Sequence, residues 1–172
     1  MEKKTALDTQ FADGQTIVYP MQGVGLITEI FKKDFKGTET RYYKIYLEVS
    51  DMTVMVPVEK AVELGIRAIV PVKDSEKALK LISEPNEPIT GDWKMRYQMN
   101  LDLLKSGSIL DIALVVRSLY HRSKVKELPI LERKIFDSAL KLLIDEVASS
   151  LSKSTDETEE MIFSRLETEN EE

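Results

Sequence analysis

The sequence of 172 residues contains no cysteine and a single histidine. Without cysteine the chain can form no disulfide, thiolate nucleophile or cysteine-based zinc site, as is typical of proteins in a reducing compartment. One histidine cannot build a histidine-rich metal site. The seven glycines form no phosphate-binding loop or nucleophile elbow, and the nearest approach, Gly23-Val24-Gly25, is interpreted as a tight turn between strands. The sequence therefore predicts a protein that is not an enzyme and that has no metal, cofactor or small-molecule substrate.

Long hydrophobic runs are also missing. No apolar segment approaches the roughly 20 residues that are needed to cross a bilayer, and the polar start at Met1-Glu2-Lys3-Lys4 does not resemble a signal peptide. With 42% hydrophobic residues the chain can still bury a core, in one domain or in two small ones. We therefore expect a soluble cytoplasmic protein with no membrane partner.

Acidic side chains outnumber basic ones, and the net charge of -6 on its own argues against nucleic-acid binding. The imbalance is local, however. Residues 89–151 carry 10 basic and 8 acidic side chains, whereas residues 152–172 carry 2 basic and 8 acidic ones. The tail thus accounts for the deficit, and the segment before it is weakly basic.

Residues 1–70 show the pattern of β-strands. β-Branched and aromatic residues are concentrated in four segments, which lie at residues 16–19, 24–31, 41–49 and 53–58. In the third segment the period is two: the side chains expected to face the core are Tyr43, Ile45, Leu47 and Val49, and those on the opposite face are Tyr42, Lys44, Tyr46 and Glu48. Lys36-Gly37-Thr38 suits a hairpin turn, because glycine accepts a positive φ. Short strands at this spacing predict a small barrel or a strongly bent sheet.

Beyond residue 70 the hydrophobic period becomes that of helices, so the chain as a whole is predicted to be α+β. Helices are expected at residues 76–83, from the N-cap Asp92 to Gly107, from residue 109, and at residues 129–151. The residues expected on the buried faces of the last three are Trp93, Tyr97, Leu101 and Leu104; Ile109, Ile112, Ala113, Val116, Leu119 and Tyr120; and Leu131, Ile135, Ala139, Leu142, Leu143 and Val147. The acidic tail from about residue 152 contains one amphipathic segment, around Met161, Ile162 and Leu166, and is expected to be partly disordered.

Four strings of residues resemble one protein family in their order and spacing. They are Val18-Tyr19-Pro20-Met21-Gln22-Gly23; Val54-Met55-Val56-Pro57-Val58-Glu59-Lys60-Ala61 followed by Leu64-Gly65-Ile66-Arg67; Asp92-Trp93-Lys94-Met95-Arg96-Tyr97 with Asn100-Leu101; and Val115-Val116-Arg117-Ser118-Leu119-Tyr120. Over residues 14–151 the chain is similar to the CarD/CdnL family of bacterial transcription regulators. Members of this family share an N-terminal polymerase-interaction domain with transcription-repair coupling factors.

The resemblance implies two domains and two partners. Residues 1–70 would form an SH3/Tudor-like β-barrel that docks on the β subunit of RNA polymerase through an exposed strand edge. Residues 71–172 would form an all-α bundle that contacts promoter DNA, with Trp93 as a minor-groove wedge at the upstream edge of the bubble that stabilises the open complex. Such a protein would lie in the cytoplasm and reach the nucleoid through its polymerase.

The resemblance also suggests which side chains make these contacts. The candidate phosphate contacts, which carry little sequence specificity, are Lys94, Arg96, Arg117, Arg122, Lys124, Lys126, Arg133 and Lys134. The candidate polymerase contacts are Lys33, Met55, Tyr42 and Tyr46.

The sequence departs from the family pattern at three positions. Met55 stands where members commonly carry an arginine that contacts polymerase, and Met95 and Gln98 stand where the family tends to be basic. We therefore expect a more apolar polymerase contact and weaker, less salt-sensitive DNA binding than in a typical member. Two other functions stay open: a regulator that binds promoter DNA without polymerase, and an adaptor whose helical domain binds another protein and no DNA. For Trp93 the alternative is a side chain packed inside the bundle.

Overall fold

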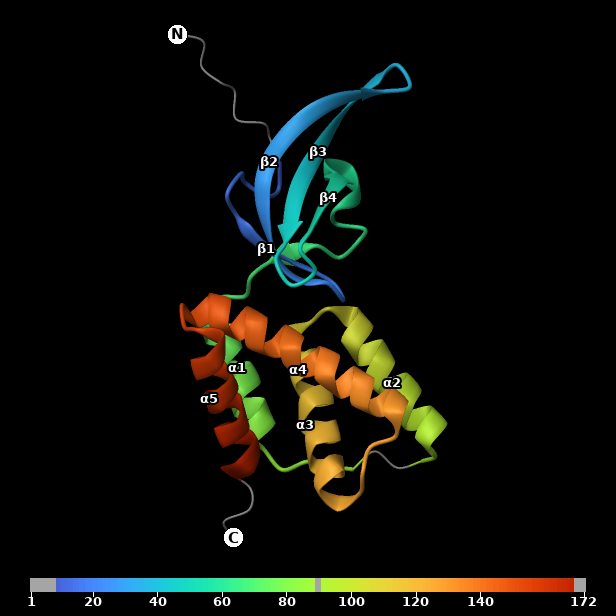
Figure 1. The fold of residues 1–172 in the computed structure, drawn as a ribbon, viewed down its shortest axis with the longest axis vertical. Coiled ribbons are helices and arrows are strands. Elements are labelled where there is room, and N and C mark those ends of the chain that lie inside the picture. Colours follow the sequence, from blue (N-terminus) through green and yellow to red (C-terminus); the bar gives the residue numbers. More distant parts are fainter. Residues whose placement is uncertain (1–8, 89–90, 169–172) are drawn as a thin grey trace.

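The computed structural model describes residues 9–88 and 91–168 of the chain. Within these residues five strands come first and five α-helices follow, which confirms the α+β class. Figure 1 shows the two parts stacked end to end, with the sheet above and the helices below. They are joined where the chain passes from the last strand into the first helix.

The described strands form one antiparallel sheet, in the order β4-β3-β2-β1-β5. Their bounds are β1 (Thr16–Tyr19), β2 (Gly23–Phe35), β3 (Thr38–Leu47), β4 (Met52–Pro57) and β5 (Arg67–Ala68), with a short 3-10 turn, η1 (Val58–Lys60), after β4. The first four lie where the sequence pattern predicts strands, with bounds that differ by a few residues. The sheet does not close into a complete barrel, since β4 and β5 lie at its two edges.

The inner face of the sheet buries a small apolar core. Tyr43, Ile45 and Leu47 of β3 are each no more than 1% exposed, as their alternation predicts. Val49 is 49% exposed, so its predicted place in the core is wrong. The reason is that β3 ends at Leu47 and the chain then turns toward β4. Alternation predicts a face only as far as the strand continues.

The hairpin of β2 and β3 is longer than the other strands. β4 pairs with β3 only from Tyr42 to Leu47, so the remainder of the hairpin, out to its turn, projects as a two-stranded ribbon (Figure 1). The predicted turn is confirmed: Lys36 and Gly37 both have positive φ, of 53° and 79°, between the paired residues Phe35 and Thr38. Positive φ at both central residues is what a type I′ hairpin turn requires.

The helices are α1 (Val72–Ser83), α2 (Trp93–Ser106), α3 (Ile109–Val125), α4 (Ile130–Leu151) and α5 (Thr155–Glu167). α3 packs against α1, α2 and α4, and its six predicted core residues are all buried. On α4 the predicted residues Ile135, Ala139, Leu143 and Val147 are buried and Leu142 is partly buried, but Leu131 is 46% exposed, so its predicted burial is wrong. None of the helices within the described residues has the length and apolar character that spanning a membrane requires.

The acidic tail is more ordered than its composition predicts. Residues 155–167 form α5, which packs on α1 and α4 through the buried residues Thr158, Ile162 and Leu166. The expectation of partial disorder is therefore wrong for this segment, and residues 169–172 lie outside the described residues. Ser154 caps the helix by accepting a hydrogen bond from the backbone N–H of Glu157 at 3.1 Å. One apolar stripe with a well-formed cap is enough to fix the helix on the bundle.

Candidate functional site

The first turn of α2 presents an aromatic side chain to solvent. Asp92 caps this turn as predicted, because its Oδ1 accepts a hydrogen bond from the backbone N–H of Met95 at 2.9 Å. Trp93, the first residue of the helix, is 47% exposed, and Lys94 beside it is also exposed. Of the other predicted stripe residues of α2, Leu104 is buried, and Tyr97 and Leu101 are partly buried against the core. Trp93 is thus not sealed in the bundle, and the packed alternative for its side chain is not supported.

A hollow of about 440 Å³ adjoins this tryptophan. It lies where the first turns of α2 and α4 meet, at one end of the bundle (Figure 1). Its apolar lining consists of Trp93 together with Pro129, Ile130 and Leu131, and Ile130 is 75% exposed. A contiguous exposed apolar surface of this kind is typical of a contact site. Leu131 is exposed because it lines this hollow, and its exposure does not mean that the core of the bundle is poorly packed.

Basic side chains border the same hollow. Arg122, near the end of α3, and Lys126, just beyond it, are part of its lining. Arg133 and Lys134 are exposed on α4 and follow directly after the residues that line the hollow. Lys94 follows Trp93 directly in the chain, and the acidic Glu127 and Glu132 line the hollow beside the cations. The structure therefore brings five of the eight candidate cations to one end of the bundle.

Arg96 has a different role from the one predicted. Its guanidinium is buried and forms an ion pair with the carboxylate of Glu132, whose side chain is 1% exposed. The Nε atom of Arg122 lies 4.0 Å from the other oxygen of that carboxylate. Arg96 thus joins α2 to α4 beneath Trp93, and the structure removes it from the candidate phosphate contacts. No sequence spacing points to this pair, because the partners are 36 residues apart.

Two further predicted cations lie apart from the cluster. Arg117 is mostly buried: its Nη1 donates a hydrogen bond to the backbone oxygen of Leu81 at 2.9 Å and lies 4.0 Å from Glu84. It therefore ties α3 to the end of α1 and is poorly placed to contact DNA. Lys124 is exposed, but its Nζ lies over the ring of Tyr120, 4.9 Å from the centroid. Lys124 therefore remains a candidate phosphate contact, but it lies at the edge of the group of cations at this end of the bundle.

The four candidate polymerase contacts share the outer face of the sheet. Tyr42 and Tyr46 alternate with the core residues of β3, and Lys44 between them is paired with Met55 of β4. Tyr42 is also paired with Phe31 of β2, two residues from Lys33, which places that lysine on the same face. Met55 is 56% exposed. The tyrosine hydroxyl of Tyr46 donates a hydrogen bond to Asp51 at 2.9 Å, and this bond raises its pKa.

Two phenylalanines on this face were missed by the sequence reasoning. The rings of Phe31 and Tyr42 stack with their centroids 5.7 Å apart, and Phe35 at the hairpin tip is 56% exposed. The register of β2 shifts between Ile27 and Glu29, so simple alternation counted from the start of the strand gives the wrong face beyond this point. A count backward from the Lys36-Gly37 turn assigns both rings correctly.

The outer edge of β4 pairs with no other strand of the described sheet. An edge strand offers a row of backbone N–H and C=O groups that another chain can use to extend the sheet. Because Met55 lies on β4, this edge borders the face that carries the aromatic residues. The sheet thus combines a free edge with an adjoining surface of exposed apolar and basic side chains.

Comparison with known proteins gives matches in both parts of the chain. Residues 11–70 match the CarD-like/TRCF RID domain, and residues 77–163 match the CarD C-terminal domain. The chain is 36% identical over 137 residues to YdeB, a provisionally assigned transcription factor of Bacillus subtilis (strain 168). The aligned region covers 80% of this chain and 90% of that relative.

Proposed function

The chain belongs to the CarD family of transcription factors, and from this premise we propose that it stabilises the open promoter complex by holding RNA polymerase and promoter DNA together. The sheet binds the β subunit of the polymerase, and the helical part contacts DNA at the upstream edge of the bubble. In this proposal the protein acts in the cytoplasm, at the nucleoid, without catalysing a reaction.

The observation that carries the proposal is the half-exposed indole of Trp93 over an apolar hollow with basic side chains around it. An aromatic group inserted at a distorted base step compensates for part of the lost stacking. The cations beside it neutralise phosphates, fix the register on the duplex and read no sequence. This combination favours DNA that is already partly melted over a regular duplex. The DNA contact is thereby suited to the edge of a bubble.

The polymerase contact is supported by the outer face of the sheet and by the free edge of β4. A partner strand added to β4 gains main-chain hydrogen bonds, and specificity comes from side chains next to the edge. Met55 lies on this edge strand, and the stacked pair of Phe31 and Tyr42 lies on the two strands behind it. With Met55 in place of a cation, the contact depends more on apolar burial and less on salt.

Tethering explains how a weakly basic domain acts on DNA. Once the sheet is bound, the helical part is held near the promoter at a high effective concentration, so a weak contact is sufficient. A bias of about 1.4 kcal/mol toward the open state changes the open-complex equilibrium tenfold. No independent, sequence-specific affinity for DNA is needed.

A promoter-opening assay with purified polymerase tests the proposal. We expect Trp93→Ala to shorten the lifetime of the open complex by roughly 5- to 150-fold, because stacking of one base on an aromatic ring is worth about 1–3 kcal/mol. Met99→Ala is the matched control, since Met99 is a 45% exposed apolar residue of the same helix that does not line the hollow. Equal lifetimes for the wild type and both variants would refute the wedge and favour the adaptor. A footprint at specific promoters in the absence of polymerase would favour the independent DNA-binding regulator.

A further inference from the structure

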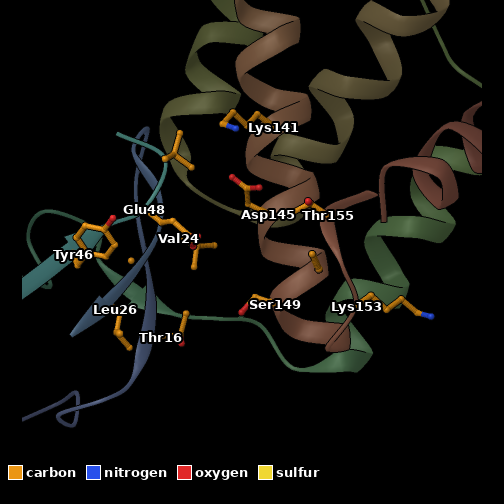
Figure 2. Close-up of a pocket in the computed structure, with 13 residues that line it drawn as sticks. Thr16, Val24, Leu26, Tyr46, Glu48, Lys141, Asp145, Ser149, Lys153 and Thr155 are labelled. Atoms are coloured by element: carbon orange, nitrogen blue, oxygen red, sulfur yellow. The ribbon is translucent and has the colours of Figure 1, made fainter. Parts of the chain in front are cut away.

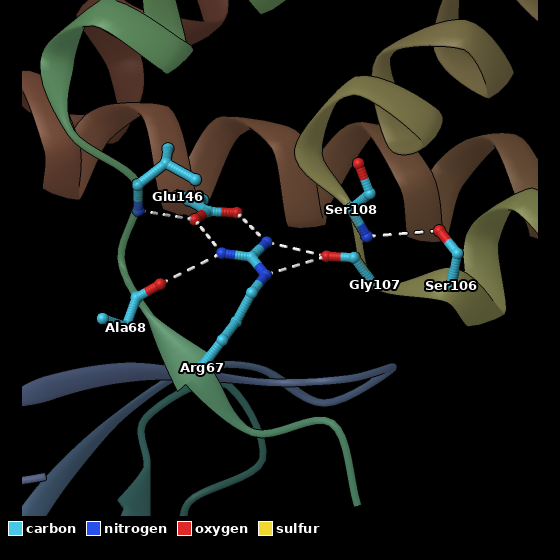
Figure 3. A network of polar contacts seen from close by, with 7 residues as sticks. Arg67, Ala68, Ser106, Gly107, Ser108 and Glu146 are labelled. Carbon is cyan, nitrogen blue, oxygen red and sulfur yellow. Dashed lines mark hydrogen bonds and ion pairs between the residues drawn. The ribbon is translucent and has the colours of Figure 1, made fainter. Parts of the chain in front are cut away.

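One arginine of the sheet makes contact with two helices at the junction of the two parts. Arg67 belongs to the edge strand β5, and its guanidinium pairs with both carboxylate oxygens of Glu146 on α4, each at 2.6 Å (Figure 3). The same guanidinium donates to the backbone oxygen of Gly107 from Nε at 3.1 Å and from Nη2 at 2.7 Å. Gly107 is the left-handed residue that ends α2. We call these three residues the clasp.

The clasp has the geometry of a strong and rigid contact. The side chain of Glu146 is 3% exposed, and one of its oxygens also accepts a hydrogen bond from the backbone N–H of Val70 at 3.1 Å. A fork-to-fork pair between arginine and carboxylate fixes direction as well as distance. Lysine cannot reproduce it, because a single ammonium group lacks the planar fork. The contact therefore sets an angle between the sheet and the helices.

The rest of the junction is a packing contact, in which β2 lies against α4. On one side Pro20 and Met21, in the turn after β1, line a small hollow together with Leu104 and Leu142. On the other side the sheet and α4 are separated by an open cleft of about 790 Å³ (Figure 2). Figure 2 shows Glu48 on the sheet side of this cleft and Asp145 on the α4 side. Glu48 and Asp145 repel each other across the cleft, and Lys141, which lines the same cleft, partly offsets this repulsion.

The position of the clasp matters because of the helix it holds. α2 ends at the clasp and begins with Trp93, and 14 residues of helix span roughly 20 Å. A tilt of about 10° at the clasp therefore moves the indole by about 3.5 Å, which is comparable to the roughly 3.4 Å rise of one base along a strand. Without the clasp, the indole of Trp93 would no longer be held at a single base step of the DNA.

We propose that Arg67 is a positioning residue that, through Gly107 and Glu146, fixes Trp93 relative to the polymerase-binding face of the sheet. The mechanical part of this inference stands on the contacts alone. Its consequence for promoter opening rests on the proposed function.

A distance measurement tests the mechanical part, and the absence of cysteine makes the labelling straightforward. Spin labels are attached to cysteines introduced at the exposed positions Glu59 and Gln98, on the sheet part and on α2, in the full-length chain. We expect one narrow distribution of distances for Arg67 and a broader distribution for Arg67→Ala. Arg67→Lys should give an intermediate width, which provides a second variant if the alanine chain folds poorly. Lys60→Ala is the control, because it breaks an exposed ion pair with Glu63 away from the junction.

Promoter opening supplies the second measurement. Arg67→Ala should bind polymerase with an affinity within about twofold of the wild type, yet lose about tenfold of the open-complex lifetime, because the indole is no longer held at its site. An unchanged, narrow distance distribution in Arg67→Ala would overturn the proposal, whatever the transcription result. A broadened distribution would support it, and if Trp93→Ala then had no effect on opening, the clasp would stand while the proposed function failed.

Discussion

The buried pair of Arg96 and Glu132 allows a quantitative test of the site's architecture. In Arg96→Met the carboxylate of Glu132, which is 1% exposed, loses its main partner. Removing one member of a buried ion pair typically costs about 3–5 kcal/mol, because the remaining charge stays desolvated. Arg122 already lies 4.0 Å from the carboxylate and can move toward it, so we expect the lower end of this range, about 3 kcal/mol.

The double variant separates loss of the pair from loss of packing. With Glu132→Met added, no uncompensated charge is left, and stability should return to within about 1 kcal/mol of the wild type. Urea denaturation followed by circular dichroism measures both effects, provided that the m-value does not change. Lys60→Met gives the exposed reference and should cost less than about 1 kcal/mol. If Arg96→Met costs no more than this reference, or if the double variant is as unstable as the single one, the reasoning about this pair is wrong.

The same variants affect the candidate DNA contact in a way that can be observed directly. Trp93 is the only tryptophan of the chain and lies three residues before Arg96, on the same side of α2. Its fluorescence therefore reports on the hollow and on no other part of the protein. We expect Arg96→Met to shift the emission of the native state, because the guanidinium under this turn is replaced by a thioether. An unchanged spectrum would mean that the pair does not shape the surface around the indole.

Two further predictions concern the sheet and its junction with α4. In Gly25→Ala the added Cβ would lie 2.8 Å from Cγ2 of Ile45, which is fully buried. We expect this overpacking to lower the free energy of unfolding by about 1–3 kcal/mol. A melting temperature equal to that of the wild type would contradict this prediction. Asp145 has a pKa above the usual value, mainly because burial disfavours the charged carboxylate; Lys141 lowers this pKa, and Glu48 raises it again. A raised pKa in the fold means that the ionised carboxylate destabilises the protein at neutral pH. Asp145→Asn should therefore melt at a higher temperature at pH 7, and the difference should vanish as the pH falls through the pKa of this carboxyl toward about 3.9, the value of an unperturbed aspartate; a constant difference across this range would refute it.

The sequence predicts much of the fold because local patterns coincide with the tertiary environment. β3 alternates strictly, and a strand with one buried face must do so. The predicted face of α3 is buried in full, because this central helix is covered along its length. The N-cap at Asp92 and the turn at Lys36-Gly37 are also local, since each is decided by hydrogen bonds or φ angles within four residues.

Features that depend on distant contacts were not predictable in this way. The burial of Arg96 depends on Glu132, and the ordering of α5 depends on an apolar surface of α1 that is left open by the other helices. The composition of the tail predicts disorder because the tail is rich in charge. Composition does not show that Ile162 and Leu166 lie on one apolar stripe, which is buried in the structure. Likewise, the register shift in β2 has no marker in the sequence, and it decides on which face Phe31 lies.

The candidate site itself lies at the point where periodicity stops being informative. A helical stripe predicts burial only where another element covers it, and Trp93 and Leu131 both lie in the first turn of their helices. Read as stripe members, both look like core residues; in the structure both are about half exposed and line one hollow. An apolar side chain left exposed at a helix end forgoes the stabilisation that its burial would give, and here two helices do so at the same place. Such an arrangement is explained more readily by a contact with another molecule than by folding, and it is the physical reason to test Trp93 before any other residue of the chain.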